Sequence, residues 1–256
     1  MPKSTNLPTY DFLYLSPHLD DVALSCGGQI YQHTQAGRRV LIVTVTAGEP
    51  ALDPAGEISA YARSLHDRWD LLADAVAGRR AEDADACALL GADFLHLDVA
   101  DCIYRLHPET GQSFYVSDAD LFGPVHPAEA ELVERVAGRF GELPGAGQVV
   151  VPLGVGNHVD HQITRLAAER VWGEQGLIYY EDFPYAQEPG AVEKVVGGQT
   201  GRWRSQDHPL TPEAMEAKIQ SILAFRSQIS TFWTDETDLR GQVGGWAEKK
   251  WLMVNG

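Results

Sequence analysis

Cysteine is scarce in this sequence: only Cys26, Cys87 and Cys102 occur among 256 residues, and no two of them form a CxxC pattern. An odd number of widely spaced cysteines argues against a disulfide framework, and the absence of CxxC pairs argues against a zinc site built from cysteine. We therefore expect three buried thiols in a protein that stays in a reducing compartment.

Basic residues are also few. The chain has 20 Lys and Arg against 36 Asp and Glu, which leaves a formal net charge of -16 at pH 7. A wide negative field repels nucleic-acid phosphates and anionic membrane surfaces. We expect no nucleic-acid partner.

Long apolar runs are missing too. No stretch reaches the roughly 18 consecutive apolar residues that a membrane-spanning helix needs. The first ten residues, MPKSTNLPTY, lack the charged start and apolar centre of a secretory signal. These absences predict a cytoplasmic protein without a membrane span.

What the sequence does contain is an alternation of strand-like and helix-like segments. The predicted strands span residues 11–16, 39–48, 93–99, 148–154 and 177–182. The predicted helices span residues 22–36, 59–77, 79–90, 127–140, 162–173 and 211–228. Such alternation is typical of a parallel sheet with helices on both faces.

We therefore expect an α/β fold, a Rossmann-like, mostly parallel sheet in a single domain. The hydrophobic content of 44% is sufficient for a core of that size. Residues 1–190 would form the catalytic core. Residues 191–256 would form a C-terminal extension that packs on the same domain and ends in an irregular, tryptophan-containing tail.

Polar clusters follow four of the predicted strands. They comprise His18, Asp20 and Asp21; Glu49; Asp98 and Asp101; and NHVDH, residues 157–161. In a doubly wound sheet, the carboxyl ends of the strands meet at the edge where such folds bind ligands. The four clusters therefore predict one shared site.

Imidazoles and carboxylates together favour zinc or a similar divalent ion, and a catalytic zinc keeps about three protein ligands and a water. His18 and Asp21 are three positions apart, as are His158 and His161, so each pair can reach one ion. This leaves Asp20 and one histidine free. A free carboxylate can take the proton of an attacking water, and a second imidazole can stabilise an oxyanion or protonate a departing amine.

SPHLDD (16–21) and HVDH (158–161) resemble the (A/P)HPDDE and HPDH motifs of the PIG-L/LmbE-like zinc-dependent N-acetylglucosamine deacetylase family. The resemblance extends through TVTAGE, RRAEDADACALLGA, YYEDFPYA and KIQSILAFRSQI, so it covers most of the chain. It implies a hydrolase that removes an N-acetyl or other small acyl group from an amino sugar or amino-sugar conjugate. The implied partner is a small N-acetylated sugar.

The resemblance also implies roles for single residues. His18, Asp21 and His161 would bind Zn²⁺, and Asp20 would be the general base. His158 would stabilise the oxyanion and act as an acid, while Asp160 orients an imidazole. Arg79 and Glu49 would lie near the sugar. Asp101, which follows the third predicted strand, is a further candidate for substrate binding on its position alone. Leu19, Val22 and Val159 replace the proline, glutamate and proline of the family motifs, and Val22 borders the site.

Other interpretations stay open at this point. His18 and Asp21 could cap the following helix, and Arg79 could pair with Glu82 or Asp83 on its own helix. A related C–N hydrolase for a non-sugar amide would use the same metal chemistry, and a non-catalytic sugar- or metal-binding module would keep only the fold. The late tryptophans could form a sugar-stacking wall, a core, or the contact of a homo-oligomer.

Overall fold

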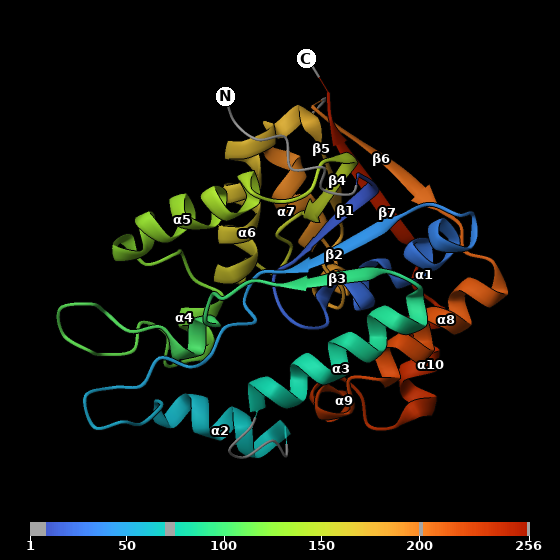
Figure 1. The fold of residues 1–256 in the computed structure, drawn as a ribbon. Helices are drawn as coiled ribbons and strands as arrows, with labels where there is room; N and C mark the ends of the chain where they lie inside the picture. Colours follow the sequence, from blue (N-terminus) through green and yellow to red (C-terminus); the bar gives the residue numbers. More distant parts are fainter. Residues whose placement is uncertain (1–8, 70–74, 200–201, 255–256) are drawn as a thin grey trace.

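The computed structural model describes residues 9–69, 75–199 and 202–254. Their strands form one seven-stranded sheet in the order β3-β2-β1-β4-β5-β7-β6 (Figure 1). The strands are β1 (Tyr10–Ser16), β2 (Val40–Thr44), β3 (Asp93–His96), β4 (Ala146–Pro152), β5 (Leu177–Tyr180), β6 (Trp203–His208) and β7 (Glu248–Met253). The first five run parallel, while β7 is antiparallel to both β5 and β6. The predicted fold, a mostly parallel α/β sheet, is confirmed.

Helices cover both faces of this sheet (Figure 1). They are α1 (Asp21–Gln35), α2 (Ala60–Trp69), α3 (Ala75–Leu90), α4 (Asp118–Leu121), α5 (Ala130–Gly141), α6 (Val159–Trp172), α7 (Ala191–Val196), α8 (Pro212–Leu223), α9 (Arg226–Phe232) and α10 (Glu236–Gly244). Alternation along β1 shows the two layers: Leu13 and Leu15 pack with side chains of α5 and α6, whereas Tyr14 packs with those of α1 and α3. None of the described helices is both long and apolar enough to cross a membrane.

Three sequence predictions about local structure are wrong. The break expected between the predicted helices 59–77 and 79–90 does not occur, because α3 continues from Ala75 to Leu90. Residues 70–74 of the first of these predicted helices lie outside the described residues. The helix expected over 211–228 is instead two, α8 and α9, with Phe225 at a non-helical ψ of 62° between them. The tail is not irregular, because it contains α10 and β7. β7 escaped detection because its first three residues, Glu-Lys-Lys, hide any apolar alternation.

The order of the strands shows at which edge of the sheet a ligand would bind. β1 lies between β2 and β4, so the chain winds away from β1 in opposite directions. The carboxyl ends of β1 and β4 therefore flank the switch point at which ligands bind in such sheets. His18 follows β1 and His158 follows β4.

A buried ion pair ties the late part of the chain to this core. Lys218 Nζ of α8 lies 2.9 Å from Glu248 Oε1 of β7, and both side chains are fully buried. The Glu248 carboxylate also accepts hydrogen bonds from the backbone N–H groups of Gly28 and Gln29 in α1, at 2.9 Å each. One carboxylate thus joins α1, α8 and the sheet.

Lys218→Met is expected to lower the free energy of unfolding by about 3–5 kcal/mol, because it leaves the Glu248 carboxylate buried without its cation. Urea denaturation measures this change. Lys194→Met, at an exposed position of α7, is the matched control and should change the free energy by less than about 0.5 kcal/mol. Equal stability of the two variants would contradict this role of the pair.

Candidate metal and catalytic site

The turn between β1 and α1 presents the first half of the site. Asp21 begins α1, and its Oδ2 accepts a hydrogen bond from the backbone N–H of His18 at 2.7 Å. The same Oδ2 lies 3.1 Å from His18 Nδ1. This turn therefore holds the imidazole and the carboxylate side by side, as their three-residue spacing predicted.

The turn between β4 and α6 presents the second half. His158 is the N-cap of α6, and its Nδ1 accepts a hydrogen bond from the backbone N–H of Asp160 at 3.3 Å. Because Nδ1 is an acceptor, a neutral His158 carries its proton on Nε2. Asp160 and His161 follow in the first turn of the helix, and both are buried.

The structure brings the three predicted metal ligands together. Asp21 Oδ2 lies 3.1 Å from His18 Nδ1 and 3.2 Å from His161 Nε2. Ligand atoms of a tetrahedral zinc with bonds of about 2.0–2.1 Å lie about 3.3 Å apart. A second grouping shares two of these residues, since ring nitrogens of His18, His158 and His161 lie within 4.8 Å of one another.

Outer carboxylates fix both imidazoles of the predicted ligand set. Asp182 Oδ1 lies 2.6 Å from His161 Nδ1, and Asp160 Oδ2 lies 3.1 Å from His18 Nε2. Each carboxylate accepts one ring N–H, which leaves the opposite nitrogen with a free lone pair. His161 Nε2 is buried, and it faces Asp21 Oδ2 at 3.2 Å. This donor set fits a divalent metal ion.

Asp21 and the imidazoles beside it shift one another's pKa values. Burial opposes ionisation of Asp21, yet His161 and His18 hold its pKa well below the usual range. Burial likewise opposes protonation of His161, but Asp21 and the hydrogen bond to Asp182 raise its pKa to about 9. Burial and the neighbouring His18 instead hold the pKa of His158 well below its ordinary value. His158 is therefore a neutral imidazole.

Asp20 stands beside this cluster. Burial raises the pKa of its carboxyl to about 7, against the opposing effect of the Arg79 guanidinium. Arg79 Nη2 lies 3.5 Å from Asp20 Oδ2, and the guanidinium carbon lies 4.9 Å from the centre of the Trp69 ring. No ion pair to Glu82 or Asp83 is present for Arg79 among the described residues.

A pocket of about 270 Å³ opens over these side chains. His18, Asp20, Asp21 and His158 line it, together with two of the predicted substrate residues, Arg79 and Asp101. Further lining comes from Tyr61, Leu65, Arg68, Trp69, Ile103, Asp118, Leu121, Phe122, Tyr185, Gln228, Thr231 and Phe232. The third predicted substrate residue, Glu49, does not line it, because its exposed carboxylate pairs with Arg80 at 3.0 Å.

Sequence reasoning missed two buried partners of the site. Asp182 lies in YYEDFPYA, as the last residue of the fifth predicted strand, so its position at a strand end was an available signal. Arg105, whose Nη1 donates to Asp160 Oδ1, stands in an irregular segment with no motif. Only the tertiary contact reveals it.

Comparison with known proteins bears on this site. A family profile described as PIG-L, GlcNAc-PI de-N-acetylase, matches residues 13–172, which is more than half of the chain. The matched region begins in β1 and ends with α6, so it includes both histidine motifs.

The chain is also similar to individual proteins that are named as deacetylases. The 2'-N-acetylparomamine deacetylase of Streptomyces fradiae is 32% identical over 185 residues, 71% of this chain but only 60% of that enzyme's length. The 2'-N-acetylparomamine deacetylase of Niallia circulans is 28% identical over 250 residues, 91% of this chain and 86% of that enzyme. The crystal structure of a zinc-inhibited form of teicoplanin deacetylase Orf2 matches with a TM-score of 0.74 and 30% identity, covering 96% of this chain and 98% of the other.

Proposed function

Because this chain belongs to the PIG-L (GlcNAc-PI de-N-acetylase) family, as its motifs predicted, we propose that it is a zinc-dependent deacetylase of amino-sugar conjugates. The observation that carries the proposal is the position of Asp21 between two imidazoles, with a second carboxylate, Asp20, in the same pocket.

We assign zinc to His18, Asp21 and His161. Asp182 and Asp160 hold the two histidine rings by their outer nitrogens. When bound, zinc lowers the pKa of a water molecule and polarises the acyl carbonyl. His158 is left out of this set because its Nδ1 accepts from the backbone and its neutral Nε2–H is a donor.

Asp20 and His158 have different roles: Asp20 is the general base, and His158 is the hydrogen-bond donor to the oxyanion. Asp20 accepts the proton of the attacking water, since its carboxylate lies in the same pocket as Asp21 and is not among the assigned zinc ligands. The Nε2–H of His158 donates to the oxyanion of the tetrahedral intermediate. Transfer of the proton held by Asp20 to the amine nitrogen then breaks the C–N bond and releases the carboxylic acid and a free amine.

The pocket supports a sugar-sized substrate. Its volume of about 270 Å³ is below the range of about 300–1,000 Å³ typical for drug-sized ligands, so a single acylated sugar fits inside and the rest of a conjugate stays outside. Aromatic rings of Trp69, Phe122 and Tyr185 offer stacking faces. Arg79 lines the pocket, which supports a contact between its guanidinium and a sugar hydroxyl.

The relatives suggest which conjugates to test. Two are named for acetylated paromamine and one for teicoplanin. The assay measures amine release from an N-acetylated aminoglycoside, an N-acylated glycopeptide and an N-acetylated amino acid as the non-sugar amide. Release from either conjugate, but not from the amino acid, is expected. Cleavage of the amino acid alone would favour the non-sugar hydrolase, and affinity for a conjugate without any cleavage would favour the binding module.

Asp182→Asn is expected to weaken zinc affinity about 10–100-fold, because a neutral amide oxygen accepts the His161 N–H more weakly than the charged carboxylate does and fixes the ring less firmly. Competition with a chromophoric chelator measures the dissociation constant. Asp207→Asn, at an exposed position in β6, is the control with the same chemical change. Unaltered zinc affinity of Asp182→Asn would contradict its proposed link to the metal.

A further inference from the structure

A buried arginine connects the catalytic motif to a second cavity. Arg105 follows the short 3-10 helix Cys102–Tyr104 and is only 7% exposed. Its Nη1 donates to Asp160 Oδ1. Its Nε and Nη2 form a fork on Glu129, at 2.5 and 3.3 Å, and Glu129 also accepts a hydrogen bond from the Tyr115 hydroxyl at 2.5 Å.

We propose that Arg105, anchored by Glu129, is a positioning residue that fixes the Asp160 carboxylate for catalysis. The inference rests on the proposed function. Arg105 holds one oxygen of Asp160, while the other oxygen contacts His18 Nε2 at 3.1 Å and accepts from the backbone N–H of Cys102 at 3.0 Å. With both oxygens bound, the plane of the carboxylate is fixed.

This plane matters because Asp160 belongs to both halves of the site. Its side chain holds the ring of His18, and its backbone N–H holds the ring of His158. Asp160 is only 1% exposed, and water that enters through the space left by Arg105 brings neither the positive charge nor the fixed geometry of the guanidinium. A displacement of about 1 Å at such a ring costs about 10²-fold in rate.

Only arginine provides this geometry. Two nitrogens of the guanidinium engage Glu129 while the remaining one reaches Asp160. A lysine ammonium is a point charge and cannot span both carboxylates with a fixed fork. Arg105 does not line the substrate pocket, so its substitution should affect kcat and leave KM unchanged.

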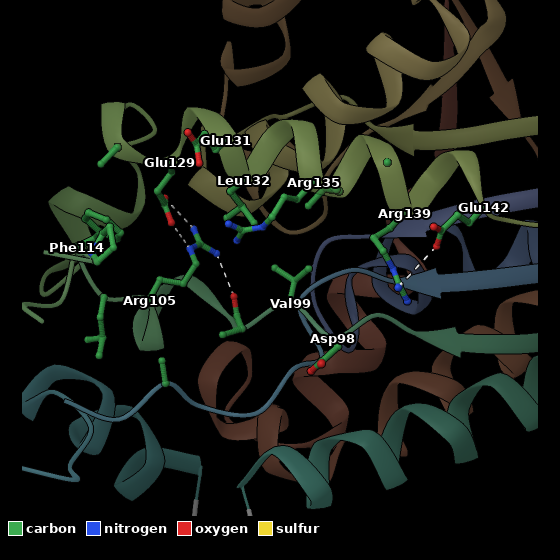
Figure 2. Close-up of a pocket in the computed structure, with 17 residues that line it drawn as sticks. Asp98, Val99, Arg105, Phe114, Glu129, Glu131, Leu132, Arg135, Arg139 and Glu142 are labelled. Carbon is green, nitrogen blue, oxygen red and sulfur yellow. Dashed lines mark hydrogen bonds and ion pairs between the residues drawn. The ribbon is translucent and has the colours of Figure 1, made fainter. Parts of the chain in front are cut away.

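The cavity beside Arg105 makes a direct test feasible. A groove of about 750 Å³ lies between α5 and the segment that follows β3, and Arg105 forms part of its wall. Figure 2 shows Arg105 directed toward Glu129, with Leu132 and Arg135 of α5 on the neighbouring side. A guanidinium ion can therefore reach the space that a shortened side chain leaves.

Arg105→Ala is expected to lower kcat about 10–100-fold without a change in KM. Added guanidinium should restore kcat, and methylammonium, a cation without the planar fork, should not. Arg105→Lys should remain as slow as Arg105→Ala. Arg135→Ala, which removes an arginine at an exposed position of the same groove, is the control and should keep the wild-type kcat.

Zinc affinity gives a readout that does not depend on turnover. It should fall about 10-fold in Arg105→Ala and recover with guanidinium, even if the unsubstituted protein cleaves none of the conjugates. Failure of the proposed function is thereby distinguished from failure of this inference. Glu129→Gln, which preserves shape, should also lower kcat and serves if Arg105→Ala does not fold. Wild-type kcat in both Arg105→Ala and Glu129→Gln would overturn the inference. A loss of kcat in Arg105→Ala that guanidinium does not restore would overturn it as well.

Discussion

Asp20→Asn is expected to lower kcat by about 10²–10⁴-fold, the usual contribution of a general base. The amide has nearly the same shape as the carboxylate, so the contact with Arg79, 3.5 Å from Asp20 Oδ2, is weakened without a loss of packing. The variant should bind zinc, because Asp20 is not among the assigned ligands. Amine release under saturating substrate, with zinc content measured on the same sample, tests the expectation.

Asp85→Asn provides the control for this prediction, since it makes the same change at an exposed position of α3. It should leave turnover unaltered. Asp20→Asn with wild-type kcat and full zinc content would rule out Asp20 as the base. A second possible result, full kcat loss with zinc also lost, would assign Asp20 to metal binding instead.

Removal of the metal is expected to lower kcat for deacetylation by about 10³-fold or more, because Lewis-acid chemistry supplies several kcal/mol of transition-state stabilisation. The metal-free protein should stay folded, since Asp21 pairs with both His18 and His161. Zinc should raise its unfolding temperature by mass action. Dialysis against a chelator, followed by stepwise return of zinc with activity and thermal unfolding recorded in parallel, measures both effects.

The return of zinc must begin below one equivalent, because the proposed site of His18, Asp21 and His161 holds a single ion. Activity should be maximal near one equivalent. Asp21→Asn is the informative comparison, as it keeps the side-chain shape and loses the charge that lies between the two imidazoles. Full turnover by protein free of metal, or recovery of Asp21→Asn at the same zinc concentration as wild type, would contradict the proposed metal site.

Several features of the protein could be predicted from short segments of sequence. β1 and α1 follow from an apolar run and a helix pattern around HLDD, and the three-residue spacing of His18 and Asp21 is realised directly by the turn between them. His158 and His161 are likewise placed by the start of α6. These features depend on contacts between residues close in the chain, which periodicity and turn residues encode.

The extent of individual elements was less predictable. Gly78 suggested a helix end, yet α3 passes through it, because packing against α1 and α8 outweighs the weak local preference. β7 was missed because its charged first residues hide an apolar pattern, and the first of them, Glu248, is stabilised by a partner 30 positions earlier, Lys218. Tertiary contacts decided both cases against the local pattern.

By itself, the sequence determined the family, the parallel α/β sheet and the two histidine motifs with their neighbouring aspartates. Only the tertiary structure decided that Asp182 holds His161, that Arg105 holds Asp160 and that Glu49 pairs with Arg80 away from the pocket. The physical reason is that motif spacing is fixed by the geometry of one turn, whereas a contact across 21 or 55 positions depends on strand order and helix packing, which leave no periodic signal in the chain.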